Sequence, residues 1–336
     1  MSEIKHLLHK VVRFFRANLH THSTCSDGVL TPQEIKEAYK ARGYQIVAFT
    51  DHEVCVAHPE LNDEDFLALT SYELSVDGPG KCYHLNFFAK DPENRWQNFN
   101  RESCCWGAVN YVDQVVCDGN EERENSLEYV NGMIRKANEK GFLVAYNHPT
   151  WSQQSYPDYA GLKGLWAMEI YNHACVSVGY EEYNDRVYQD LLMEGNRLFP
   201  LATDDFHRYE HGIAGGWIMV GAKSLTYGDV MEALEKGDFY ASTGPQIHSL
   251  TLEGNVLKVN CSEAVNVKIR AHVRSAVRLM PETGETMTEA CCDLTPWLER
   301  WKANGTLAGA FIRVTVTDRA GNKASTRAYY LDELLR

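Results

Sequence analysis

The chain of 336 residues is long enough for a large catalytic domain with or without an appendage. Hydrophobic residues make up 44% and charged residues 24%, and no apolar run approaches the roughly 20 residues that cross a bilayer, so we expect no membrane span. The net charge of −13 argues against a broad surface for duplex nucleic acid, but a small nucleotide stays possible because metal ions can neutralise clustered carboxylates.

The ten cysteines lack the regular pairing of a disulfide framework. Cys104-Cys105 and Cys291-Cys292 are adjacent pairs rather than the spaced pairs of a structural zinc site. We therefore expect reduced thiols and a cytoplasmic protein. Apolar side chains at helical spacing from Ile4 to Phe15, without a leader cleavage pattern, predict a packed helix at the start of the sequence.

Short apolar runs alternate with amphipathic helices over the first two thirds of the chain. Thr31 and Glu34 have the spacing of a capping box, with Pro32 in the first turn, and the helix they begin ends at Arg42-Gly43. Similar signals predict strands at 45–49, 142–146, 165–171 and 197–202, and helices at 126–141, 180–194 and 227–236. Polar clusters follow several of these strands, which is typical of the active-site face of a (β/α) barrel.

Two regions depart from this rhythm. Segment 91–125 is rich in Asn, Glu and aromatic residues without a clear period, and we interpret it as an insertion that caps the site. After residue 245, short runs of period two with turn signals at Gly254-Asn255 and Gly321-Asn322 predict strands. The sequence thus predicts an α/β domain over 1–245, followed by a small β-sandwich over 246–336.

A pair of histidines gives the sharpest local signal. His20 and His22 are two apart, and on a strand both point to the same face, where they can hold one ion. One such pair is weak support for a metal site, but similar groups recur at other strand ends. The further candidate ligands are Asp27, His52, Glu73, His84, His148, Asp205 and His207. Mixed imidazole and carboxylate sets suit Zn²⁺, Mn²⁺ or Fe²⁺.

The order and spacing of these motifs over about residues 16–239 resemble the PHP (polymerase and histidinol phosphatase) family of metallohydrolases. The resemblance implies a distorted (β/α)₇ barrel with two or three divalent ions (Zn, Mn or Fe). By position, it implies one ion held by His20, His22, Glu73 and Asp205, a second held by Glu73, His84 and His148, and a third held by Asp27, His52 and His207.

The stretch GDFYASTGP at 237–245, with the β segment after it, is also similar to PHP-like hydrolases related to carbaryl hydrolase. That second resemblance shifts the expected substrate from phosphate esters toward carboxyl esters, carbamates or amides. In both cases water activated by the ions is the expected nucleophile. Neither GxSxG nor GxxxxGK[ST] occurs, so serine-hydrolase and P-loop mechanisms have no support.

Other polar residues near the motifs are candidates for supporting roles. Asp51 and Asp204 precede proposed ligands and could orient them, or equally could cap helices. His173 is a candidate proton donor, with packing as the alternative. Arg208 and His211 are candidates for contact with an anionic substrate, with a plain surface role as the alternative.

The tryptophans Trp96, Trp106 and Trp151 either line the mouth of the pocket or pack in the core. The leading hypothesis is a metal-dependent phosphoesterase for a small phosphate ester, a nucleotide or a short oligonucleotide. The alternative is a hydrolase of carboxyl esters, carbamates or amides with the same ions. A third interpretation is a non-enzymatic binding module on a metal-holding scaffold, and the oligomeric state stays open.

Overall fold

A computed structural model describes residues 4–8 and 13–334. The first ten strands are Ile4–His6 (β1), Phe14–Asn18 (β2), Ile46–Phe49 (β3), Leu67–Gly78 (β4), Lys81–Ala89 (β5), Phe142–Tyr146 (β6), Ala167–Asn172 (β7), Phe199–Thr203 (β8), Trp217–Gly221 (β9) and Phe239–Ser242 (β10). The helices among them are Pro32–Lys40 (α1), Leu127–Glu139 (α2), Tyr156–Tyr159 (α3), His173–Ser177 (α4), Asp185–Met193 (α5) and Tyr227–Lys236 (α6).

The remaining elements form the C-terminal part. They are the strands Ile247–Glu253 (β11), Val256–Ala264 (β12), Asn266–Ala271 (β13), Ser275–Leu279 (β14), Met287–Asp293 (β15), Phe311–Thr317 (β16), Lys323–Thr326 (β17) and Tyr329–Tyr330 (β18), with the helices Thr295–Ala303 (α7) and Leu331–Leu334 (α8). Neither α7 nor α8 was predicted from the sequence. No helix in the described ranges has both the length and the apolar character that a membrane crossing requires.

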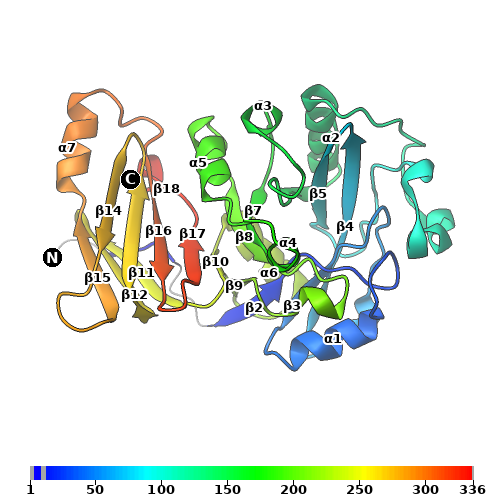
Figure 1. The fold of residues 1–336 in the computed structure, drawn as a ribbon, viewed down its shortest axis with the longest axis horizontal. Helices are drawn as coiled ribbons and strands as arrows, with labels where there is room; N and C mark the ends of the chain where they lie inside the picture. Colours follow the sequence, from blue (N-terminus) through cyan, green and yellow to red (C-terminus); the bar gives the residue numbers. More distant parts are fainter. Residues whose placement is uncertain (1–3, 9–12, 335–336) are drawn as a thin grey trace.

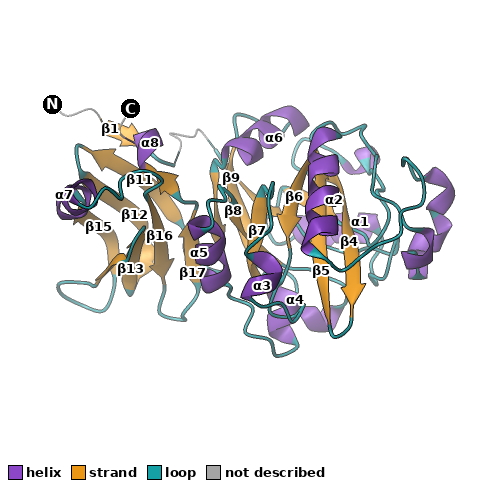
Figure 2. Cartoon of the chain, turned by 90° about the horizontal axis from the view of Figure 1, so that it is seen from above, coloured by secondary structure: helices purple, strands orange, loops and turns teal. Residues whose placement is uncertain are grey.

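A large mixed sheet carries the N-terminal part. Strands β2, β3 and β4 pair in parallel, β5 pairs antiparallel with β4 and β6, and β6, β7 and β8 are again parallel. Beyond the ends of β2 and β8, the His22 N–H donates to the Phe206 carbonyl (2.9 Å), and the Asp205 N–H donates to the His20 carbonyl (2.8 Å). The sheet therefore curves back on itself at the carboxyl ends of its parallel strands. Figure 2 shows α2 over this part of the sheet on the right and the C-terminal strands on the left.

The strict alternation of strands and helices expected for a (β/α)₇ barrel does not run through the whole sheet. Strands β4 and β5 are joined by the tight turn at Gly78–Gly80 instead of by a helix, which antiparallel pairing permits. Helix α5 begins at Asp185 rather than Tyr180, because Tyr183 bridges to Tyr171 on β7. The expected α/β class is confirmed, together with β6 at 142–146 and α6 at 227–236.

The C-terminal strands build two facing layers. One layer has the order β1-β11-β12-β15, while β14, β13, β16 and β17 extend the large sheet through the pair β17–β10. Apolar side chains from both layers, including Leu250, Leu257, Ile269 and Val314, form one buried cluster. Figure 1 shows these strands at one end of the molecule, with α5 between them and the rest of the large sheet.

The helix predicted from Ile4 to Phe15 is wrong where the structure describes it. Residues Ile4–His6 form strand β1, paired with β11, and β2 begins at Phe14; residues 9–12 lie outside the described part. The edge of β11 offers backbone hydrogen bonds that a local helical pattern cannot outweigh. Segment 91–125 holds short 3₁₀ turns at Arg101–Ser103, Trp106–Asn110 and Val112–Gln114.

A buried ion pair joins the C-terminal strands to α5. The Arg313 guanidinium, 1% exposed, donates to Asp185 Oδ1 (2.5 Å) and to Gln189 Oε1 (3.1 Å). We expect Arg313→Ala to lower the free energy of unfolding by about 3 kcal/mol, because it leaves Asp185 without its main partner. Lys223→Ala, which removes an exposed pair with Glu232 on α6, should cost less than about 1 kcal/mol in the same urea titration. Equal losses would contradict this account.

Candidate metal centre

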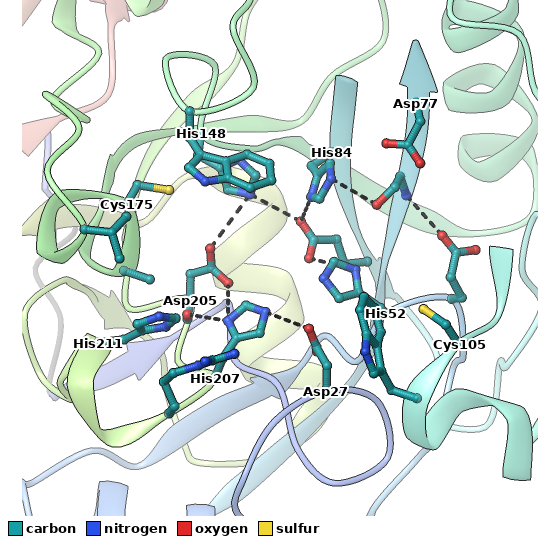
Figure 3. Close-up of a pocket in the computed structure, with 18 of the residues that line it drawn as sticks. Asp27, His52, Asp77, His84, Cys105, His148, Cys175, Asp205, His207 and His211 are labelled. Atoms are coloured by element: carbon teal, nitrogen blue, oxygen red, sulfur yellow. Dashed lines mark hydrogen bonds and ion pairs between the residues drawn. The ribbon is translucent and has the colours of Figure 1, made fainter. Parts of the chain in front are cut away.

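Nine side chains predicted as ligands converge at the carboxyl ends of the parallel strands. Figure 3 shows six of them around the cavity, namely Asp27, His52, His84, His148, Asp205 and His207. His20 and His22 follow β2, His52 follows β3, and Glu73 lies on β4. The others are His84 on β5, His148 after β6, Asp205 and His207 after β8, and Asp27 on the loop after His22. Residues nearly 190 positions apart thus meet because strand ends of one curved sheet share an edge.

The innermost group is fully buried. His20 Nε2 and His22 Nε2 lie 3.1 Å apart, and Glu73 Oε2 is 3.1 Å from the first and 3.2 Å from the second. Asp205 Oδ1 is 3.2 Å from both nitrogens. These four residues are the set implied for the first ion, and their donor atoms surround one point closely enough for a single cation.

The other two implied sets adjoin the first. Glu73 Oε1 lies 3.0 Å from His84 Nδ1 and 3.5 Å from His148 Nε2. His207 Nε2 lies 3.4 Å from Asp27 Oδ2, and His52 groups with them. The structure also shows that His22 borders two sets, which the sequence did not suggest. Its Nδ1 lies 3.5 Å from Asp27 Oδ1, so His22 is next to the third set as well as part of the first.

Hydrogen bonding inside the innermost group fits a cation. His20 Nδ1 lies 2.6 Å from Glu169 Oε1, so that nitrogen donates its proton and Nε2 turns a lone pair toward two carboxylates. His22 Nδ1 and Asp205 Oδ1 are buried without a hydrogen-bond partner. Facing lone pairs repel one another, and only a proton or a metal ion between them removes the repulsion.

In the metal-free protein, protons on the imidazoles of His20 and His22 remove this repulsion between lone pairs. Burial opposes the charge on His20, but Asp205, Glu73 and Glu169 together raise its pKa well above the ordinary value. Burial also opposes the charge on His22, but the facing carboxylates of Asp205, Glu73 and Asp27 raise its pKa to about 10. Burial instead lowers the pKa of His52 to about 3 and that of His207 to about 4, which leaves both imidazoles neutral and able to bind metal.

Glu169 is a functional residue that the sequence analysis missed. It is fully buried and accepts hydrogen bonds from the Thr203 hydroxyl (2.7 Å), the Asn172 amide (2.9 Å) and the His148 backbone N–H (3.2 Å), besides its bond with His20. It therefore fixes the ring of His20 and the loop of His148 together. One feature of the sequence could have indicated it: Glu169 is a carboxylate within a predicted buried strand, three positions before the end of that strand at Asn172.

Asp51 and Asp204 support the site differently from the prediction. Asp51 accepts hydrogen bonds from the Ser23 N–H (2.7 Å) and from the hydroxyls of Ser23 and Ser26 (both 2.8 Å). Asp204 accepts from three successive backbone N–H groups at 214–216. The sequence left two roles open for each residue, orienting a ligand or capping a helix, and these hydrogen bonds indicate a third, since each carboxylate holds a loop beside the ligands.

The remaining candidates divide between the cavity and its surroundings. His173 bonds through Nδ1 to the Tyr171 hydroxyl (2.9 Å) and packs against Gly215, outside the cavity lining, so its predicted role as proton donor is not supported. Arg208 and His211 both line the cavity, and Arg208 is exposed at its mouth. Trp96 is buried in the main core.

The cavity has a volume of about 460 Å³ and contrasting walls. One wall carries the candidate ligands, and the rest includes Trp106, Trp151, Cys105 and Val178. A cavity with these walls admits a small molecule whose anionic group lies at the candidate metal ligands and whose apolar group lies against the opposite wall.

All ten cysteines of the chain are unpaired.

No family model matches the chain. A curated relative, a 5'-3' exoribonuclease of Haemophilus influenzae, is 32% identical in an alignment of 168 residues that covers 45% of this chain and 60% of that protein. A solved two-domain protein from Bacteroides vulgatus with a predicted PHP-like metal-dependent phosphoesterase gives a TM-score of 0.48 at 15% identity, over 97% of this chain and 98% of that one. A proposed metal-dependent phosphoesterase from Bifidobacterium adolescentis gives 0.41 at 14% identity, over 58% and 88%.

Glu169→Gln tests the support of His20. The amide keeps the shape of the side chain but removes the charge that holds the His20 proton, so we expect metal affinity to fall about 10- to 100-fold. The measurement is a titration of the metal-free protein with Zn²⁺ or Mn²⁺ by calorimetry. Glu181→Gln, an exposed neighbour in the sequence, should leave the affinity unchanged. An unchanged affinity for Glu169→Gln would exclude this role.

Metal binding should also release protons. His20 and His22 have raised pKa values in the metal-free protein, so both hold protons at pH 7 that an incoming cation must displace. Apparent affinity should therefore increase as the pH rises from 6 toward the pKa of about 10 of His22. Calorimetry in buffers of different ionisation enthalpy measures the release, and its absence would show that these imidazoles are not ligands.

Proposed function

We propose that the chain is a PHP-type metal-dependent phosphoesterase that acts on a small phosphate ester, a nucleotide or a short oligonucleotide. The observation that carries the proposal is the convergence of nine imidazole and carboxylate side chains, seven of which line one open cavity while His20 and His22 lie buried directly behind it. A purely structural metal site needs four ligands and no access for a substrate. A set of this size, facing a cavity, suits catalysis better.

Two or three divalent ions, Zn²⁺, Mn²⁺ or Fe²⁺, would be held by the three adjoining sets, and His22 and Glu73 each border more than one of them. Such ions, when bound, lower the pKa of water to near neutrality and neutralise negative charge on the reacting oxygens. The chain itself provides rigid support for the ligands through Glu169 and Asn147, whose amide donates to Glu73 Oε1 (2.7 Å). Arg208, at the mouth, provides a positive charge for an anionic substrate.

The proposed substrate class draws on the curated relative. A 5'-3' exoribonuclease cleaves phosphodiester bonds, and the matched segment spans 60% of that protein. A net charge of −13 and one arginine on the cavity wall suit a short single-stranded ligand better than a duplex. No observation favours the carboxyl-ester, carbamate or amide alternative. The ten unpaired cysteines agree with the expected reducing compartment, the cytoplasm.

Removal of a shared carboxylate tests the function. Asp205→Asn should abolish hydrolysis of p-nitrophenyl phosphate and of nucleotide phosphates after loading with Mn²⁺ or Zn²⁺, because it removes a charge common to several ligand pairs. Asp65→Asn, at an exposed position, should keep the activity of the unmodified chain. A panel of aryl esters run in parallel separates the alternatives, since turnover of esters without any phosphatase activity would overturn the proposal.

A further inference from the structure

Two tryptophans expose their rings at the cavity. Trp106 is 63% exposed and Trp151 is 37% exposed, and both line the wall. Trp106 lies beside His52, with ring centroids 6.3 Å apart. Trp151 lies beside His84 and His148, with ring centroids 5.2 and 5.0 Å away. The two indoles therefore border different members of the ligand set, with the His52 and His84 rings between them.

The backbone at Trp106 is held in an unfavourable conformation. Its φ is +49°, a left-handed value that bulky residues seldom adopt. The next residue, Gly107, approaches the Asp27 loop so closely that a Cβ would lie 2.4 Å from the Thr24 carbonyl oxygen, and its N–H donates to the Ser26 carbonyl (2.8 Å). This docking of the 91–125 insertion on a ligand-bearing loop presents the indole of Trp106 to the cavity.

The backbone at Trp151 is held by hydrogen bonds to Glu182. The fully buried carboxylate of Glu182 accepts hydrogen bonds from the Trp151 N–H (2.8 Å) and the Thr150 N–H (3.1 Å). The Thr150 hydroxyl donates to Asn184 Oδ1 (2.8 Å). The turn after His148 is thus anchored at two residues, while the indole it carries stays open to solvent. Holding an exposed aromatic ring rigidly is of use when the ring contacts a ligand.

We propose that Trp106 and Trp151 are stacking platforms for the two nucleosides that flank the scissile phosphate, which makes a short oligonucleotide the preferred substrate. The proposal rests on the proposed phosphoesterase function and deepens it. Each platform borders the ligand set on its own side, so a phosphate at the ligands has one ring available to each neighbouring base. Flat indoles accept every base through its π face, so this binding tolerates all sequences.

Three substrates and two variants test the platforms. Ribose 5-phosphate has no base, a mononucleotide has one, and a phosphorylated diribonucleotide has two. With the metal-loaded full chain, Trp106→Leu and Trp151→Leu should each raise KM for the diribonucleotide about tenfold. Only one of them should raise KM for the mononucleotide, and neither should alter KM for ribose 5-phosphate. Trp106→Phe and Trp151→Phe should restore most of the affinity.

Trp297→Leu, on α7 and outside the cavity lining, is the matched control and should leave all three KM values unchanged. Equal increases in KM for ribose 5-phosphate and the diribonucleotide, or no increase for either, would overturn the stacking proposal while leaving the phosphoesterase intact. Binding of adenosine, measured by NMR line broadening, gives a second readout that needs no turnover. If no phosphate ester is hydrolysed, the proposed function is wrong. If both leucine variants still bind adenosine as tightly as the unmodified chain, the stacking proposal is wrong as well.

Discussion

A single buried carboxylate organises the centre of this molecule. Glu73 lies within 3.5 Å of ring nitrogens from five histidines. Two of these histidines follow β2, and the other three come from three different parts of the sheet. A charge so far from solvent is tolerated only when positive groups surround it. Accordingly its pKa lies well below the ordinary value, because His20, His52 and His84 together outweigh the opposing effect of burial. The sheet must curve to bring these histidines to one carboxylate.

The supporting residues show how the fold keeps that arrangement. Asp51 and Asp204 bind loops through serine hydroxyls and backbone N–H groups, and Glu169 links the ring of His20 to the turn at His148. Within this support, His22 Nδ1 and Asp205 Oδ1 are left without a hydrogen-bond partner. Rigid surroundings and unsatisfied donor atoms are together what a preorganised metal site requires.

Sequence reasoning located most of the ligands because they follow recognisable strands, and strand ends of a parallel sheet gather at one edge. Glu73 and His84 lie within β4 and β5, and the order of the motifs indicated them. The same reasoning missed Glu169, because the partner that explains a carboxylate in this buried strand, His20, lies 149 positions away in the sequence. It gave His173 too much weight, because position at a strand end does not specify the direction of a side chain, and this ring turns toward Tyr171. The helix expected from Ile4 and the missed helix α7 failed for a related reason: strand pairing and packing between layers depend on partners far along the chain.

The most direct test of the account is a crystal structure of the chain after loading with Mn²⁺ or Zn²⁺, with anomalous diffraction recorded at the absorption edge of the metal. The account predicts an anomalous peak between His20, His22, Glu73 and Asp205, with one or two further peaks within bonding distance of the neighbouring imidazoles. A loaded protein without a peak among these side chains, or with metal bound only at surface carboxylates, would contradict it.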